Sequence, residues 1–138
     1  MPTNKILVSV VDDDLYIAKL FYEALRQNID EIEVSSFTDP VSAFEHFIEN
    51  SKNFALIISD LKMPGLNGLE LLKKVKNSNP EVRTILMSAY NFEEEKLYQT
   101  YMKEAIINST IEKPVTMNRL YQRVKEELKL FRIGQAKK

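Results

Sequence analysis

Five short apolar runs alternate with segments of helical spacing along the chain, and this alternation constrains its fold more than any other feature. Each run has the length of one strand, and the run that begins at Phe54 is apolar almost throughout, which is typical of a strand buried on both faces. Repeated strand and helix units favour a parallel sheet with right-handed crossovers and helices on both faces. The expected strands are Ile6 to Val11, Ile32 to Phe37, Phe54 to Ser59, Val82 to Ser88 and Ile106 to Glu112.

The segments between these runs carry apolar residues three and four positions apart, as the buried face of a helix does. Asp14 and Asp39-Pro40 are suited to begin the first two helices, because a carboxylate caps free backbone N–H groups and proline fits the first turn. The fourth segment, near Leu97, has the weakest pattern, and the last, from Met117 to Phe131, has the clearest. We therefore expect a doubly wound α/β fold.

A length of 138 residues fits one domain, for which we expect the bounds 1–138, a core of about residues 5–131 and a flexible tail over 132–138. The formal net charge of −1 gives no electrostatic support for binding nucleic acid or a membrane surface. The absence of cysteine excludes disulfides and thiolate chemistry. No apolar run approaches the roughly 20 residues of a membrane span. These features favour a soluble, cytoplasmic protein.

Polar side chains stand at the ends of four of the expected strands. Asp12 and Asp13 follow the first strand, Asp60 follows the third, Ser88 ends the fourth and Lys113 follows the fifth. Because the carboxyl ends of parallel strands lie at one edge of a sheet, where such folds bind ligands, these side chains should meet there. An acidic pair alone is more often a helix cap or a solvated turn, so the inference depends on the coincidence of all of them.

Clustered carboxylates repel one another, and a cation would relieve the repulsion. Oxygen ligands select a hard ion such as Mg²⁺, with Mn²⁺ as a substitute, and Mg²⁺ in proteins usually reaches out to a phosphate oxygen. Lys113 would then supply a second positive charge and Ser88 a hydroxyl donor. A carboxylate oxygen of Asp60 would attack phosphorus and form an aspartyl phosphate. The pattern therefore indicates phosphoryl-transfer chemistry at this edge.

Four motifs carry a resemblance to a known family: "VVDDD" at 10–14, "SDLKMPGLNGLELL" at 59–72, "ILMSAY" at 85–90 and "IEKPV" at 111–115. With these motifs the chain resembles, over roughly residues 5–131, the receiver domain of two-component response regulators, and among them the stand-alone chemotaxis and sporulation-relay members. The resemblance implies a flavodoxin-like, five-stranded parallel sheet of order 2-1-3-4-5. It also implies a phosphoprotein that acts in signal transduction and receives its phosphoryl group from a histidine kinase or a histidine phosphotransfer protein.

The resemblance also assigns roles to individual residues. Asp60 would be the phosphoacceptor, and it would hold Mg²⁺ together with Asp12, Asp13 and the backbone carbonyl of Lys62. Two further side chains, Ser88 and Lys113, would contact the phosphoryl oxygens, and the bond between Lys113 and Pro114 would be cis. Asp14 is instead expected to begin the first helix and not to bind the metal.

The chain departs from the family pattern at Thr110, three positions before Lys113, where an aromatic residue is usual. Threonine cannot bury a ring, so we expect phosphorylation to be read mainly through the loop after Ser88 and the helix that follows it. Two further positions, Lys62 and Tyr90, lie two residues after Asp60 and Ser88, where family members control access of water to the acyl phosphate. A long cation and a bulky ring there predict slow self-dephosphorylation, as suits a phosphorelay intermediate.

The leading hypothesis is a signalling switch that is not an enzyme towards other substrates and acts by binding a downstream target. It would be able to dimerise through the face formed by the fourth helix, fifth strand and fifth helix. The main rival is an aspartate-nucleophile phosphatase of the haloacid-dehalogenase kind, although that family wants a second acid at the position of Lys62. A receiver-shaped module that is never phosphorylated and a receiver cut from a longer regulator are also compatible with the pattern. The sequence does not identify the kinase, the signal, the target or the oligomeric state.

Overall fold

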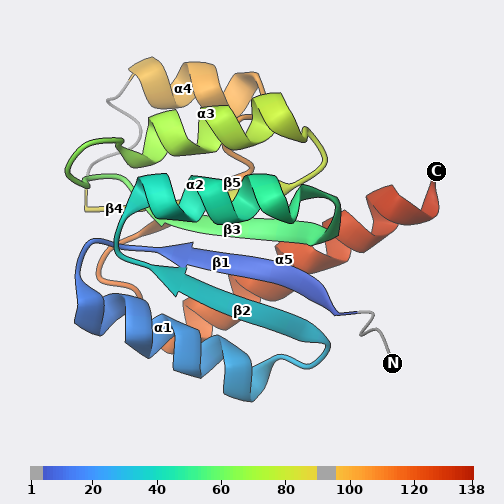
Figure 1. The fold of residues 1–138 in the computed structure, drawn as a ribbon, viewed down its shortest axis with the longest axis horizontal. Helices are drawn as coiled ribbons and strands as arrows, with labels where there is room; N and C mark the ends of the chain where they lie inside the picture. Colours follow the sequence, from blue (N-terminus) through green and yellow to red (C-terminus); the bar gives the residue numbers. More distant parts are fainter. Residues whose placement is uncertain (1–4, 90–95) are drawn as a thin grey trace.

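The computed structural model describes residues 5–89 and 96–138, and its centre is a five-stranded parallel sheet (Figure 1). The strands lie in the order β2-β1-β3-β4-β5, with every neighbouring pair parallel. Their bounds are β1 (Ile6–Val11), β2 (Ile32–Phe37), β3 (Phe54–Asp60), β4 (Arg83–Ser88) and β5 (Ser109–Glu112). The expected sheet and its strand order are confirmed.

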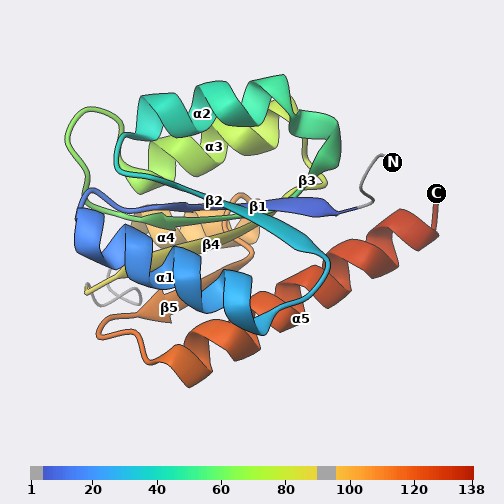
Figure 2. The same cartoon turned by 60° about the horizontal axis from the view of Figure 1, so that its bottom comes forward.

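Helices cover both faces of the sheet. Helices α1 and α5 pack on one face and α2 and α3 on the other, so that the strands form the middle of three layers (Figure 2). The buried side chains of α4, Tyr98 and Tyr101, belong to the same core as those of α2 and α3. The bounds are α1 (Leu15–Asn28), α2 (Pro40–Glu49), α3 (Gly68–Ser78), α4 (Lys96–Lys103) and α5 (Met117–Ala136), with a short 3-10 turn η1 (Ser51–Asn53) before β3. This is the doubly wound arrangement expected from the alternating pattern.

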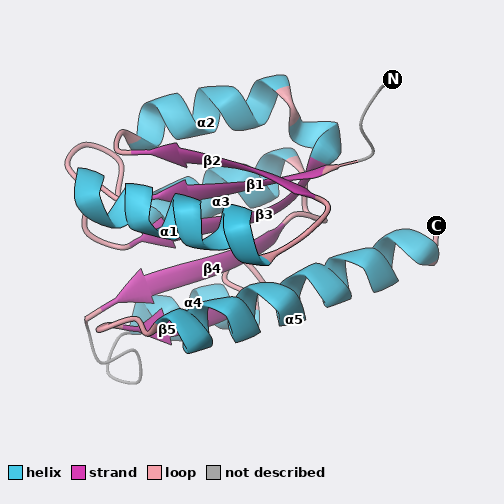
Figure 3. Ribbon diagram, turned by 90° about the horizontal axis from the view of Figure 1, so that it is seen from below, coloured by secondary structure: helices cyan, strands magenta, loops and turns pink. Residues whose placement is uncertain are grey.

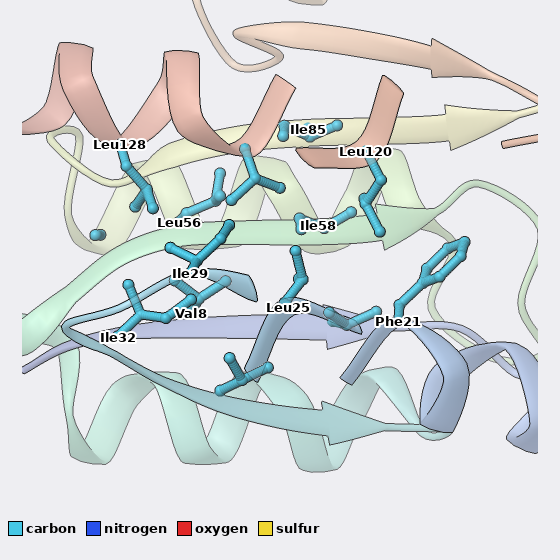
Figure 4. Close-up of a cluster of buried hydrophobic side chains, with 14 of the residues drawn as sticks. Val8, Phe21, Leu25, Ile29, Ile32, Leu56, Ile58, Ile85, Leu120 and Leu128 are labelled. Atoms are coloured by element: carbon cyan, nitrogen blue, oxygen red, sulfur yellow. The ribbon is translucent and has the colours of Figure 1, made fainter. Parts of the chain in front are cut away.

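Each face of the sheet has its own apolar core. Between the sheet and helices α1 and α5, side chains such as Leu25, Ile58 and Leu128 are buried together (Figure 4). On the other face, Phe47, Leu72 and Tyr98 belong to a second cluster under α2, α3 and α4. All residues of β3 are buried, because this central strand has a helical layer on either side.

Side-chain caps begin helices α1, α2, α3 and α5, the last through the Thr116 hydroxyl, which accepts from the Arg119 N–H. The Asp14 carboxylate accepts from the backbone N–H groups of Tyr16 and Ile17 at the start of α1, and Asp39 caps α2, with Pro40 in its first turn. Asn67 caps α3 and forms a reciprocal capping box with Glu70. The expectation that Asp14 begins the first helix is confirmed.

The fifth strand begins three residues later than expected, at Ser109 and not at Ile106. The side chains of Ile106 and Ile107 are buried, but their backbone N–H groups both donate to the Tyr101 carbonyl at the end of α4. Ala105, with φ at 60°, turns the chain there. Ile106 and Ile107 thus look like part of a strand in the sequence because both are apolar and buried, although their backbone N–H groups bond to the end of α4.

Helix α5 continues to Ala136, so helix occupies most of the segment expected as a flexible tail over 132–138 (Figure 3). Near its end, the Gln135 amide donates to Glu81 at 3.1 Å, and Lys138 forms an ion pair with the same carboxylate. These contacts join the end of α5 to the turn before β4. Among the described residues, no helix is both long enough and apolar enough to cross a membrane.

Candidate functional site

The carboxyl ends of the strands lie together at one edge of the sheet, to which the strand arrows point in Figure 3. Asp12 follows β1, Asp60 is the last residue of β3, Ser88 is the last of β4 and Lys113 follows β5. Backbone hydrogen bonds hold these ends in register, since Asp12 N–H donates to Phe37 and Lys113 N–H donates to the Ser88 carbonyl at 2.9 Å. The parallel sheet thus brings together residues that are far apart in the sequence.

Three carboxylates form the acidic part of the site. One oxygen from each of Asp12, Asp13 and Asp60 lies within 4.8 Å of the other two. Asp12 is 1% exposed and Asp60 is 7% exposed, whereas Asp13 faces solvent. Two buried acids and one exposed acid therefore share a small volume.

The Asp12 carboxylate is held in place and is incompletely satisfied. Its Oδ1 accepts from the Asp14 backbone N–H at 2.9 Å, while Oδ2 is buried and accepts no hydrogen bond from the described residues. Burial raises the pKa of Asp12 despite the hydrogen bond from Asp14, and the nearby Asp60 charge adds to the increase. A cation bound here would give Oδ2 a close ligand and offset the repulsion between the carboxylates, so these residues fit a hard divalent ion.

Lys113 provides the positive charge of the site. Its Nζ lies 2.9 Å from Asp60 Oδ1 and 3.6 Å from Asp12 Oδ2. Burial opposes the charged form, but the hydrogen bond to Asp60 and the two carboxylate charges raise the pKa of Lys113 above its ordinary value. The peptide bond between Lys113 and Pro114 is cis, as the family resemblance implied.

A cavity of about 300 Å³ opens over Asp60 and is lined by Lys62, Ser88, Ala89 and Lys113. Ser88 is 3% exposed, so its hydroxyl belongs to the inner wall, whereas the Lys62 side chain lies nearer to solvent at the mouth. The cavity therefore combines an acceptor carboxylate, a hydroxyl and an ammonium group. Ala89 was not singled out in the sequence, and its position directly after Ser88 was the only signal that could have found it.

The loop after Asp60 turns sharply and fixes this aspartate. Gly65 has φ at 83°, a conformation that favours glycine. Gly68 begins α3 so close to the strand that a Cβ atom built on it would lie 2.2 Å from the Asp60 carbonyl oxygen. Its N–H donates to the Leu61 carbonyl at 2.8 Å. Glycine is therefore needed at position 68 so that the helix can pack against the end of the strand.

The expected roles of Thr110 and Tyr90 are not tested by the structure. Thr110 lies in β5 opposite Leu86, is half-buried and is not among the residues that line the cavity. Tyr90 lies outside the described residues. Its expected role in shielding the acyl phosphate stays a prediction from the sequence, as does the expected consequence of threonine at position 110.

A second, larger groove of about 590 Å³ adjoins the site and was not foreseen. It runs from Asp13 and Lys62 to Leu97 and Tyr98 on α4. Tyr98 and Tyr101 are 2% and 9% exposed, so both rings pack in the core. The groove was missed because the loop after β3 and helix α4 form it together only in the folded protein.

Comparison with known proteins agrees with this architecture. A family model of the response regulator receiver domain matches residues 8–125. The regulatory protein VanRB of Enterococcus faecalis is 30% identical over 136 residues, which cover 94% of this chain and 58% of that protein. The hydrogenase transcriptional regulatory protein HoxA of Bradyrhizobium diazoefficiens is 28% identical, with 91% of this chain and 24% of that protein covered. The chain thus spans less than two thirds of the length of either relative.

Solved structures with the same fold include receiver domains. A CheY-like response regulator receiver domain protein from Methanospirillum hungatei is 25% identical with a TM-score of 0.80, covering 94% of this chain and 98% of that one. A receiver domain protein from Clostridium thermocellum is 23% identical with a TM-score of 0.81, covering 93% and 98% of the two chains. The chain belongs to the family of response regulator receiver domains, which act in two-component signalling.

Proposed function

We propose that this receiver domain accepts a phosphoryl group on Asp60 from a phosphohistidine of a partner protein and then changes its affinity for a downstream target. The observation that carries the proposal is the position of Asp60. Its carboxylate ends a buried strand, contacts the Lys113 ammonium at 2.9 Å and faces a cavity of about 300 Å³. A nucleophile, a counter-charge and room for a phosphoryl group therefore coincide.

In the reaction, a carboxylate oxygen of Asp60 attacks phosphorus, the P–N bond to the partner imidazole breaks, and the nitrogen leaves with the bonding pair. Lys113 stabilises negative charge on the transferring oxygens, and the Ser88 hydroxyl donates a hydrogen bond to one of them. Asp12, Asp13, Asp60 and the Lys62 carbonyl are the groups that would hold Mg²⁺, or Mn²⁺ in its place. The bound ion supplies positive charge that offsets the carboxylates and the incoming phosphoryl group.

The proposal extends to partners and cellular setting. The phosphodonor would be a histidine kinase or a histidine phosphotransfer protein, and the domain would act as a relay intermediate in the cytoplasm. Leu97 and Met102 on α4 are 46% and 43% exposed and could contribute to a partner or dimer face with β5 and α5. The whole chain, residues 1–138, is proposed to act as one receiver domain.

The decisive experiment is incubation with Mg²⁺ and a small phosphodonor such as acetyl phosphate, followed by intact-mass measurement. We expect the wild-type chain to gain one phosphoryl group and Asp60→Asn to gain none. Asp30→Asn, which removes an aspartate in the turn before β2, is the matched control and should still gain the group. A phosphoryl gain that persists in Asp60→Asn would contradict the assignment of the acceptor.

The same preparation separates a switch from a phosphatase. A switch holds one phosphoryl group per chain and hydrolyses only its own acyl phosphate. A haloacid-dehalogenase-like enzyme would release inorganic phosphate from an unrelated phosphate ester over many turnovers. Continuous turnover of such an ester, lost in Asp60→Asn, would favour the enzyme.

A further inference from the structure

Lys76 stands apart from the other lysines of α3. It lies near the carboxyl end of the helix and is half-buried, whereas Lys73 and Lys74 in the same helix are exposed. Its ammonium group reaches Asn108, the residue before β5, and therefore lies at the amino ends of the strands. This edge is opposite to the one that holds Asp60.

The hydrogen-bond partners of Lys76 are neutral. Its Nζ donates to Asn108 Oδ1 at 2.8 Å and to the Pro80 carbonyl at 3.4 Å. Asn108 is itself fixed, because its Oδ1 also accepts from the Thr84 backbone N–H at 2.9 Å. Within the described part of the chain, Lys76 forms no ion pair with a carboxylate. The charged form of this amine therefore lacks a counter-ion there.

The charged groups around this amine are Arg83 from β4 and Glu127 from α5. The Glu127 carboxylate is already occupied, since Arg83 Nε donates to it at 2.8 Å and the Ser109 hydroxyl donates at 3.0 Å. Burial and the positive charge of Arg83 lower the pKa of Lys76 to about 8, against a smaller opposing effect of Glu127. Near pH 7.5 the neutral form of such an amine is therefore far more abundant than that of an ordinary lysine.

We propose that Lys76 is a modification site, at which its ε-amine accepts an acyl group directly from a small acyl phosphate. The neutral amine places its lone pair on the carbonyl carbon of the donor. The N–C bond forms, the C–O bond to phosphate breaks, and inorganic phosphate leaves with the bonding pair. The surplus amine proton passes to water, so no oxidant or reductant is needed.

The surroundings of Lys76 suit the product of this reaction. The amide product has a single N–H. This N–H can keep the short hydrogen bond to Asn108 Oδ1, and only the longer one to the Pro80 carbonyl is lost. The product is uncharged, so acylation removes a half-buried positive charge beside Arg83. A carboxylated lysine would instead place a new negative charge near the buried Glu127, and it is the less suitable product.

The test is incubation of the folded chain with acetyl phosphate at pH 7.5, followed by peptide mass spectrometry of each lysine. We expect Lys76 to be acetylated roughly tenfold faster than Lys73 and Lys74, which serve as references on the same helix. The Asp60→Asn variant should give the same result, because the proposal does not depend on the phosphoacceptor. In a parallel arm, acetyl-CoA should favour Lys76 less, because its bulk hinders approach to a half-buried amine.

Asn108→Asp provides the sharpest control. It retains an acceptor oxygen for Lys76 and for the Thr84 N–H but adds a negative charge beside the amine. We expect this variant to slow acetylation of Lys76 about tenfold, by holding the amine protonated, and to leave Lys73 and Lys74 unchanged. The proposal is overturned if Lys76 reacts no faster than Lys73 and Lys74, if Asn108→Asp leaves its rate unchanged, or if only acetyl-CoA modifies it.

Discussion

Lys113, which follows β5, and Asp60, which ends β3, form a direct ion pair with Nζ and Oδ1 2.9 Å apart. The same ammonium lies 3.6 Å from Asp12 Oδ2, so one lysine spans two buried acids. It partly neutralises the carboxylates that a divalent ion would also bind. The Lys113 ammonium and a bound metal ion would thus compete for the carboxylates of Asp12 and Asp60.

We predict that Lys113→Met abolishes most phosphorylation without abolishing metal binding. The phosphoryl oxygens lose their stabilising charge, and the rate of Asp60 phosphorylation by acetyl phosphate should fall on the order of 100-fold. Affinity for Mg²⁺, measured by calorimetry, should stay the same or rise, because the competing cation is gone. Lys125→Met, on the exposed face of α5, should change neither quantity. Equal phosphorylation rates in both variants would exclude a role for Lys113 in the reaction.

Asp12 gives a prediction about pH. Its pKa is raised in the folded protein by burial and by Asp60, so the folded state holds its proton more tightly than the unfolded state does. Stability should therefore fall as the pH rises from the ordinary value of 3.8 through the raised folded pKa. Asp12→Asn should increase the free energy of unfolding of the metal-free protein at pH 7 on the order of 1 kcal/mol.

Chemical denaturation at pH 3 and pH 7 without divalent ions measures this effect. Asp12→Asn should increase the free energy of unfolding at pH 7 but not at pH 3, where the Asp12 carboxyl is protonated in both the folded and the unfolded state. Adding Mg²⁺ should then stabilise the wild-type chain, by about 2.7 kcal/mol at 100 times the dissociation constant. The variant should respond much less. A variant that is less stable than the wild type at pH 7 without metal would refute this account of Asp12.

Much of the site could be predicted because it depends on topology and on residue type. Once the alternating pattern fixes parallel strands, the residues at their ends must share an edge, and Asp12, Asp60 and Lys113 do lie together. The local sequence also contained the Asp14 cap and the turn before Gly68. These features require only short-range spacing and the rule for parallel strands.

Some features of the molecule depend on contacts that no local pattern specifies. Burial of Ile106 suggested a strand, but its N–H is used at the end of α4. The His46 ring packs against Phe37 and Phe54, with centroids 5.3 and 5.6 Å away. The neutral surroundings of Lys76 come from a turn and from the start of another strand. Such arrangements follow from tertiary packing and not from periodicity.

Lys62 gives a prediction about the lifetime of the phosphorylated form. Its side chain lines the mouth of the cavity, where it would hinder an attacking water molecule. We expect Lys62→Asn to speed loss of the phosphoryl group roughly three- to tenfold, a barrier change of about 1 kcal/mol. Tyr90→Ala should act in the same direction, while Lys73→Asn on the exposed face of α3 should not. Unchanged lifetimes in the first two variants, followed by intact mass over time, would reject the shielding hypothesis.

Gly68 gives a prediction about how Asp60 is held. In Gly68→Ala the new Cβ would lie 2.2 Å from the Asp60 carbonyl oxygen and 2.9 Å from Leu86 Cδ1, so the backbone must shift. We expect a loss of stability of about 1–3 kcal/mol and weaker Mg²⁺ binding. Gly134→Ala is the control, because nothing lies within 4 Å of its Cβ and alanine favours a helix, which predicts a gain of about 0.5–1 kcal/mol. Similar melting temperatures for the two variants would contradict the close approach at position 68.

Glu127 gives a prediction about the opposite edge of the sheet. It is 3% exposed, and its carboxylate accepts from Arg83 Nε at 2.8 Å and from the Ser109 hydroxyl at 3.0 Å. Glu127→Ala would leave the Arg83 charge without its partner and the Ser109 hydroxyl without an acceptor. Breaking a buried pair from one side usually costs about 3–5 kcal/mol, and since Arg83 is partly exposed we expect the lower end of that range.

The neighbouring residue Glu126 is the matched control. It is exposed on the same turn of α5 and pairs with Arg123 at 3.5 Å across solvent. Because exposed pairs contribute little, Glu126→Ala should change stability by less than about 0.5 kcal/mol. Urea denaturation of both variants at pH 7 measures the difference. Since Glu127 lies away from the acidic cluster, its loss should lower stability while Mg²⁺ affinity in the folded state stays unchanged. A stability cost as small as that of Glu126→Ala would contradict the role given to the Glu127 pair, and a large change in Mg²⁺ affinity would show that the two edges are not independent.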